Sequence, residues 1–344
     1  MKASHMNASS DFMFAKLHGR WASSFTENKI VRLVRGENIQ VLARELAALP
    51  VSLEDRTQVQ QQLNSHLIRE LAGIRRFLSQ GEAHFYTHFL DKFFFENLKT
   101  VLHYRYAATA EDDIRSLLVS SPVLEKFDID ELVEASSLHQ FYRRLPDHPV
   151  KGEVLPILVE LDSTRDLFVA ESKLDILYYR SFLDAARELG RATRTTAEEL
   201  VRTEIDISNA IVFLRNAAIY QLGRDTIRDL TIGGGMSIDA ASIDKLLVCE
   251  TRPEVEHSLP QPYGRTVGKA GDEPLYMCEN RLWTLLHMKA YEAFNDFGNP
   301  VRAAIAFPFL KRAEHLNLGR VFEGLYLKLA PRLVETMLIG TFGV

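Results

Sequence analysis

The chain has 344 residues, of which 46% are hydrophobic and 25% are charged, and this composition excludes extended disorder. Its net charge of −5 argues against generic nucleic-acid binding, and its two cysteines cannot form a disulfide framework or a four-ligand zinc site. The longest apolar run, residues 303–310, is far shorter than the ~20 residues of a membrane helix, so we expect no direct membrane insertion. The opening MKASHM is interpreted as an expression remnant, and residues 1–20 lack the apolar segment of a signal peptide.

Helical spacing of apolar residues dominates the sequence. An apolar stripe with steps of three and four residues runs from Leu63 to Leu78, and a second runs from Leu174 to Leu189, where Gly190 is predicted to end the helix. Period-two alternation typical of a strand appears only weakly, at residues 157–161. The predicted fold class is therefore all-α. Long helices are also expected at 85–106, 198–221, 282–297 and 309–329, with loops at 146–152, 233–235 and 260–274.

The sequence repeats itself at a spacing of about 110 residues. Residues 171–209 align without a gap on residues 279–317, and residues 128–146 align in the same way on residues 242–260. The first third follows the same order, with residues 29–50 ending in Leu-Pro ahead of the next helices. Because each unit is too long for a solenoid repeat, we predict three similar helical domains in a pseudo-threefold, funnel-like arrangement. Their boundaries are predicted at residues 1–110, 111–222 and 223–344.

A recurrent asparagine is the most distinctive local feature. Asp206 and Asn209 lie three residues apart on one helix face, and the repeat matches them with Glu314 and Asn317. We interpret these residues as structural markers in which an amide beside a carboxylate ties its helix to a neighbouring backbone, a contact termed here a bracket. Asn97 marks the first unit, where Phe94 replaces the acid, so the bracket there must differ or rely on Glu96.

Other motifs give weak signals for chemistry. Gly233–Gly235 lacks the Lys-Ser/Thr of a phosphate loop and is predicted to form a turn. His84 and His88 have helical spacing but no third ligand, so no metal site is expected there, and Cys249 and Cys278 are interpreted as small core residues. We therefore predict no catalytic residues and no cofactor.

Charge differs between the three thirds of the chain. Residues 1–110, 111–222 and 223–344 carry +4, −8 and −1. Such asymmetry is compatible with solvated helix faces or with partners of different charge on different faces.

The order of these motifs resembles one family, the component of V-type and archaeal-type ATPases called C in prokaryotes and d in eukaryotes. The resemblance rests on FMFAKLHGRWASSF (12–25), FFFENLKTVLHYRY (93–106), EIDISNAIVFLRNAAIYQL (204–222), TIGGGMSIDAASIDKLL (231–247) and FPFLKRAEHLNLGRVFEGL (307–325). It spans roughly residues 12–340 and departs from the family at Phe94 and in the linker 51–61.

The resemblance implies a non-catalytic rotor part rather than an enzyme. Family members are funnel-shaped and sit on the cytoplasmic face of the membrane. They link the central axle, made of the D and F subunits, to the membrane proteolipid ring, and they lie near the a/I subunit of the membrane stator. Through this link they transmit torque for ATP-coupled H⁺ or Na⁺ transport. Two alternatives remain open: a helical scaffold or adaptor that binds a partner helix or peptide, and an all-α enzyme with an unrecognised site.

Overall fold

The computed structural model describes residues 2–36, 56–106, 114–124, 126–268 and 273–340, and within these ranges the chain forms helices and no strand. The predicted all-α fold class is therefore confirmed. The first half contains α1 (Lys2–Ala22), α2 (Glu27–Arg35), α4 (Arg56–Arg75), α5 (Gln80–Leu90), α6 (Lys92–Tyr106), α7 (Ile114–Leu117), α8 (Ile129–Val133), α9 (Leu138–Arg144) and α10 (Lys151–Thr164). The second half contains α11 (Leu167–Arg187), α12 (Arg191–Arg215), the π-helical turn η2 (Asn216–Tyr220), α13 (Arg224–Asp229), α14 (Ala240–Leu246), α15 (Arg252–Ser258), α16 (Tyr263–Val267), α17 (Leu275–Phe294), α18 (Arg302–Tyr326) and α19 (Pro331–Met337).

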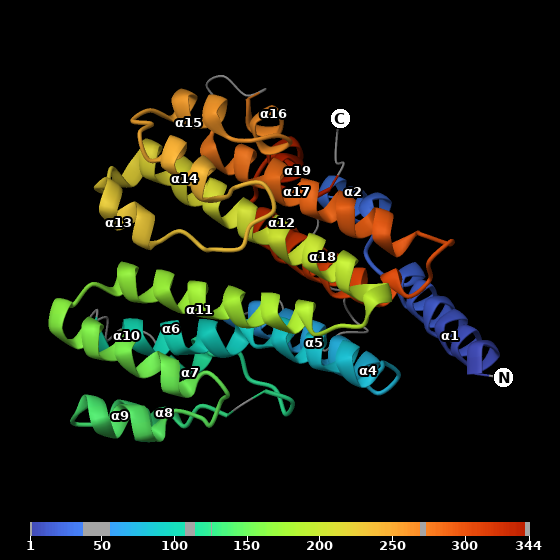
Figure 1. Cartoon of the computed structure of the whole chain (residues 1–344), viewed down its shortest axis with the longest axis horizontal. Helices are drawn as coiled ribbons and strands as arrows, with labels where there is room; N and C mark the ends of the chain where they lie inside the picture. Colours follow the sequence, from blue (N-terminus) through green and yellow to red (C-terminus); the bar gives the residue numbers. More distant parts are fainter. Residues whose placement is uncertain (1, 37–55, 107–113, 125, 269–272, 341–344) are drawn as a thin grey trace.

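Long helices form the body of the molecule and short helices lie outside it. Figure 1 shows α11 and α12 crossing the middle, with α5 and α6 on one side and α17 on the other. The short helices α8 and α9 flank the first side, and α14 to α16 flank the opposite side (Figure 1). None of the helices in the described ranges is long and apolar enough to span a membrane.

The helices follow the apolar stripes of the sequence. On α4 the side chains of Leu63, Leu67, Leu71 and Ile74 are all buried. Residues one helical turn apart face the same side, so this helix places one apolar face against its neighbours. The stripe from Leu174 to Leu189, which runs along α11 and two residues past its end, is buried in the same way.

Four local expectations are wrong. The loop expected at 260–274 contains the helix α16, and the long helix expected at 85–106 is broken at Asp91 into α5 and α6. Residues 157–161, whose alternation hinted at a strand, lie inside α10, where Leu158 and Leu161 are buried at helical spacing. Gly190 does not end α11, which stops at Arg187. It is instead the N-cap of α12, with φ of −62° rather than the left-handed backbone of a helix-ending glycine.

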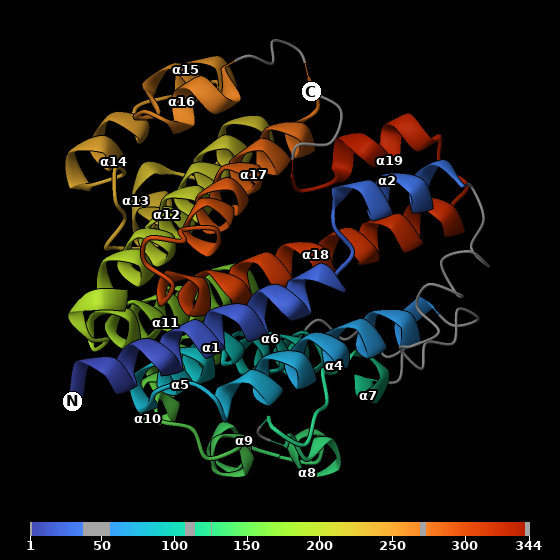
Figure 2. The same cartoon turned by 90° about the vertical axis from the view of Figure 1, so that its right-hand side faces the viewer.

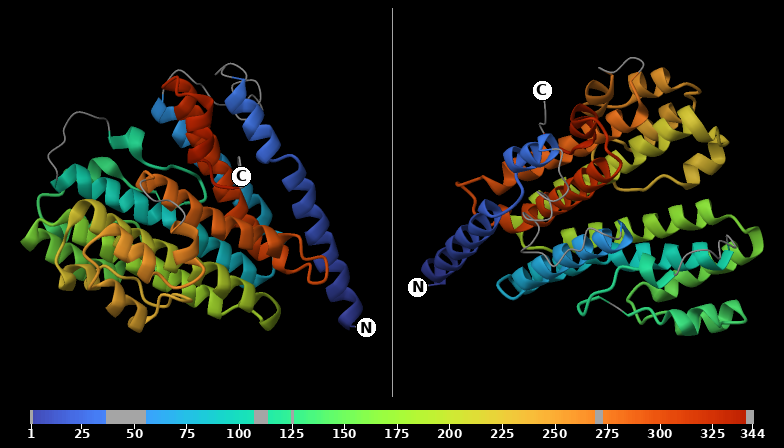
Figure 3. Two further views of the ribbon diagram at one scale, coloured as in Figure 1. Left: turned by 90° about the horizontal axis from the view of Figure 1, so that it is seen from above. Right: turned by 180° about the vertical axis from the view of Figure 1, so that it is seen from behind.

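Helices from the two ends of the described chain meet in a second, smaller core. This core joins α2 and α4 to α18 and α19 through Ile30, Leu63, Val321, Phe322 and Val334, and Figure 2 shows α2 lying beside α19. Helix α1 runs along α18 and along the edge of the body (Figures 2 and 3). Residues 37–50, the rest of the predicted first hairpin, and residues 51–55 of the unaligned linker lie outside the described residues.

Candidate functional site

All three marker asparagines make the same pair of hydrogen bonds. Asn209 Nδ2 donates to the carbonyl oxygen of Ile232 over 2.8 Å, and the Ile232 amide donates to Asn209 Oδ1 over 2.8 Å. Asn97 makes this bracket with Val119 at 2.8 Å for both bonds, and Asn317 makes it with Ile339 at 2.7 Å for both.

The chemistry of the amide explains why asparagine recurs. A side-chain amide offers one donor and one acceptor, which match the carbonyl and N–H of a single backbone residue. All three asparagines are buried, so an unpaired backbone partner would carry a desolvation cost. Each bracket therefore ties a long helix to the backbone 22 or 23 residues further along the chain.

Asp206 lies one helical turn before Asn209 and holds the glycine-led turn that follows Ile232. Its carboxylate accepts the amides of Met236, Ser237 and Ile238 at 2.7–3.1 Å and the hydroxyl of Tyr263 at 2.9 Å. Burial raises the pKa of the Asp206 carboxyl, while these four hydrogen bonds oppose the rise. The turn predicted at Gly233–Gly235 is thus wrapped around a carboxylate.

The glycines of this turn give a matched pair of substitutions. A Cβ on Gly235 would lie 2.1 Å from Asp206 Oδ1, whereas a Cβ on Gly233 would meet no atom within 4 Å. Gly235→Ala is therefore expected to lower the free energy of unfolding by about 1–3 kcal/mol, the usual cost of overpacking. Urea denaturation should show this loss, with Gly233→Ala close to wild type. Equal effects of the two variants would contradict the close approach.

Glu314, the match of Asp206 in the last unit, reaches the beginning of the chain. Its Oε1 accepts the amide of Phe25 at 2.6 Å, and its Oε2 forms an ion pair with Lys311. Lys311 also pairs with Glu70 of α4 at 2.9 Å and donates to the hydroxyl of Ser24 at 2.9 Å. This buried charge cluster joins α4, α18 and the connection between α1 and α2.

His315, next to Glu314, gives a prediction about pH. Burial lowers its pKa to about 4, with a further contribution from nearby His66, against ~6.5 in the unfolded chain. Between these values the unfolded chain binds a proton that the folded chain does not, so stability is lost as the pH falls. Replacing His315 by isoleucine, the residue at the matching position 207, should remove about 2 kcal/mol of the stability difference between pH 7 and pH 5. Urea denaturation at both pH values tests this; an unchanged pH dependence would contradict it.

The first unit uses an aromatic contact where the others use a carboxylate. The ring of Phe94 lies 5.4 Å from that of Phe127 and stacks on His148 at 4.1 Å between ring centroids. Glu96 is exposed and lies beside Lys99, so the suggestion that it replaces the missing acid is wrong. The first unit therefore keeps the two bonds of the Asn97 bracket and replaces the carboxylate one turn before the asparagine with an aromatic ring.

The residues contacted at these three positions all lie at the same distance before a short helix. Ile238, Phe25 and Phe127 each lie two residues before a short helix, namely α14, α2 and α8. Asp206 therefore holds the start of the third unit's short helices, and Phe94 contacts the start of the second unit's. Glu314 has the same role for the first unit. It holds the backbone just before the short helix α2, near the opposite end of the sequence.

A buried charged cluster joins α12 and α18 at residues that the sequence did not single out. Arg312 of α18 donates to both carboxylate oxygens of Glu204 of α12 at 2.9 and 2.6 Å, and the Glu204 side chain is fully buried. Tyr179 also donates to Glu204 at 3.0 Å, and Lys92 lies over the ring of Tyr178. Burial alone would raise the pKa of Glu204, but the charge of Arg312 lowers it below its ordinary value.

A signal for this cluster was present in the repeat. Lys92, Glu204 and Arg312 are separated by 112 and 108 residues, the same spacings that separate the three marker asparagines. They are therefore matching residues of three units, placed two positions before the acid or its phenylalanine replacement. Two of the three are basic and one is acidic, so the pattern is visible through position and not through residue type.

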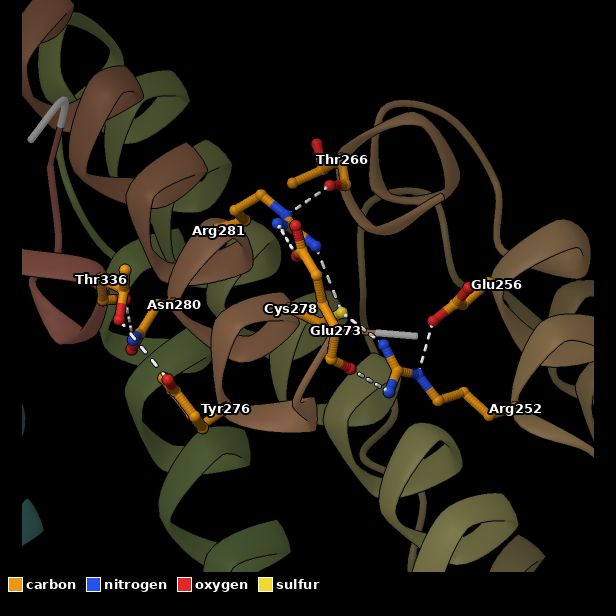
Figure 4. Close-up of polar contacts among 9 residues, drawn as sticks. All are labelled: Arg252, Glu256, Thr266, Glu273, Tyr276, Cys278, Asn280, Arg281 and Thr336. Atoms are coloured by element: carbon orange, nitrogen blue, oxygen red, sulfur yellow. Dashed lines mark hydrogen bonds and ion pairs between the residues drawn. The ribbon is translucent and has the colours of Figure 1, made fainter. Parts of the chain in front are cut away.

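The cysteines have structural surroundings. Figure 4 shows Cys278 between Arg252 and Arg281, whose guanidinium nitrogens lie 3.1 and 3.3 Å from its sulfur. Burial raises the pKa of the Cys278 thiol despite these arginines, and the side chain is fully buried, as predicted for a core residue. Cys249 is half-buried.

The histidines at i and i+4 contact each other. His84 Nε2 and His88 Nε2 lie 3.2 Å apart, and His88 Nδ1 is 3.0 Å from the hydroxyl of Ser181 and 3.1 Å from Asp91 Oδ2. Within the described ranges no three His, Cys, Asp or Glu side chains gather in a way that could hold a metal ion.

Known proteins place the chain in a family. The sequence matches the model of the ATP synthase (C/AC39) subunit family over residues 13–337. The C subunit of the A-type ATP synthase of Methanococcoides burtonii is 25% identical over 269 residues, which cover 76% of this chain and 73% of the relative. The C subunits of the A-type ATP synthases of Methanosarcina barkeri and Methanosphaera stadtmanae are 25% and 24% identical, covering 73% and 69% of this chain and 68% and 61% of those relatives. This match over nearly the whole length of the chain leads to one conclusion: the chain belongs to the ATP synthase (C/AC39) subunit family.

Proposed function

We propose that the chain is a non-catalytic central-rotor component of a prokaryotic V/A-type ATPase. In this role it links the axle of the D and F subunits to the proteolipid ring, on the cytoplasmic face of the membrane and near the a/I subunit of the stator. It transmits torque for ATP-coupled H⁺ or Na⁺ transport. Family membership supports a place in such a complex.

The observation that carries the proposal is the contact between the last unit and the first. Glu314 of α18 binds the backbone of Phe25, as Asp206 binds the backbone ahead of α14. Such contacts favour a closed set of three units, with boundaries near residues 110 and 222 and a pseudo-threefold axis close to Glu204. A closed set of three units, called here the collar, can surround an axle or bind to one face of a ring.

A helical adaptor is the alternative function. An adaptor that binds one helix in a groove gains nothing from contact between its first and last units, and it tolerates more or fewer repeats. The closing contact at Glu314 therefore favours the rotor collar over the adaptor.

Co-purification tests the proposal. The purified chain is mixed with the D–F axle and, separately, with the detergent-solubilised proteolipid ring from the same organism, and complexes are separated by gel filtration. The proposal predicts a stoichiometric complex with each. Recovery of neither would overturn it.

The uneven charge of the three thirds predicts how axle binding depends on salt. If the +4 and −8 thirds guide docking, the association rate should fall as the salt concentration rises. Stopped-flow measurements of D–F association at several ionic strengths check this; a salt-independent rate would contradict electrostatic guidance.

A further inference from the structure

A cavity of about 530 Å³ lies where the last unit meets the first. It is bounded by the connection between α1 and α2 and by α17 and α18. We call it the seam pocket and define it by six of its lining residues: Trp21, Phe25, Met288, Tyr291, Glu292 and Glu314.

The lining of the seam pocket suits a cation. Three aromatic rings, from Trp21, Phe25 and Tyr291, stand beside two carboxylates, and no lysine or arginine is among the described residues that line it. Glu314 is already paired with Lys311, whereas Glu292 is exposed and forms no ion pair within the described part of the chain. Aromatic faces together with a free carboxylate bind ammonium and guanidinium groups.

The matching face of the second unit is covered. Tyr291 corresponds to Leu183 of α11, which is only 3% exposed because the turn around Gly234 lies against it. Tyr291 itself is 49% exposed and Met288 is 45% exposed. The second and third units are joined covalently by that turn, whereas the first and last units stand at opposite ends of the sequence and have no such covalent connection.

We infer that the seam pocket receives an arginine or lysine side chain of the central axle. This inference rests on the proposed function and adds to it the place and chemistry of one contact. A single-copy partner is favoured because the last unit meets the first at one place in the chain, whereas a ring of identical chains presents many equal copies of any group. A partner that turns with the collar needs an off-axis contact to prevent slipping, and a side chain inserted into one pocket provides it.

Charge reversal at the pocket tests the inference, with a matched control in the second unit. Glu292→Lys and Tyr291→Ala both change exposed side chains, so both variants should keep the helical content and melting temperature of the wild type. Asp184→Lys alters the corresponding position of α11, where Asp184 only pairs with Arg187 at the surface. Binding of each chain to the D–F axle is measured by isothermal titration calorimetry at two salt concentrations.

We expect Glu292→Lys and Tyr291→Ala to bind the axle about tenfold more weakly than the wild type, the scale of losing one cation–aromatic or charge contact. Asp184→Lys should bind as the wild type does. Wild-type affinity in both seam variants would overturn the seam pocket as the axle contact and leave the rotor role standing. If the wild type itself binds neither axle nor ring, the proposed function fails, and this inference fails with it.

Discussion

Replacing Glu204 by alanine is expected to lower the free energy of unfolding by about 3–5 kcal/mol. The substitution leaves the guanidinium of Arg312 buried against Phe89 and Phe309 without its carboxylate. Removing one partner of a buried pair leaves an uncompensated charge in a medium of low polarity, which costs more than the pair contributes. This loss should appear in urea denaturation as a fall in the midpoint with an unchanged slope, since the slope depends on the surface exposed on unfolding.

Two further variants separate the buried charge from other effects of the substitution. Glu204→Leu combined with Arg312→Leu should be less destabilised than Glu204→Ala, because no unpaired charge remains. Glu199→Ala removes a half-exposed carboxylate from the same helix, where it pairs with Lys289, and should cost less than about 1 kcal/mol. A double variant as unstable as the single one would show that packing, not charge, accounts for the loss.

Replacing Asn209 by alanine is expected to cost about 2–4 kcal/mol of stability. Both hydrogen-bonding groups of the Ile232 backbone lose their partner in a buried site, and each unsatisfied group costs about 1–3 kcal/mol. Asn209→Asp should also be destabilised, since a carboxylate keeps the acceptor for the Ile232 amide but cannot donate to the carbonyl.

The repeat provides internal comparisons for this prediction. Asn317→Ala removes the same two bonds in the last unit and should have an effect of similar size. Asn295→Ala removes one bond at an exposed helix end and should change stability by less than about 0.5 kcal/mol. Thermal and urea denaturation of the three variants measure the differences; a neutral Asn209→Ala would contradict the bracket as a stabilising contact.

The sequence was sufficient to predict the helices and the positions that recur in each unit. Apolar spacing located α4, α11 and most of α12, α17 and α18, because one buried face per helix leaves a clear period. It failed at residues 157–161, where five residues are too few to separate helix from strand, and at Gly190, which suits a helix start as well as a helix end.

The partners of the marker residues could not be predicted from the sequence. Asn209 and Asn317 recur at matching positions of the repeat, but the backbone that each holds depends on how the chain returns after the long helix. Glu314 binds Phe25, which is 289 residues away, and no local pattern indicates a contact of that separation. Glu204 was overlooked because a glutamate within a charged helical stretch normally faces solvent.

A cryo-electron microscopy map of the chain assembled with the D–F axle and the proteolipid ring would test most directly whether the chain links the two. We predict density for all three units around one axis, between the end of the axle and the ring, with the axle touching the junction of the last and first units. A map in which the chain lies at the periphery, away from both the axle and the ring, would contradict its role as the mechanical link.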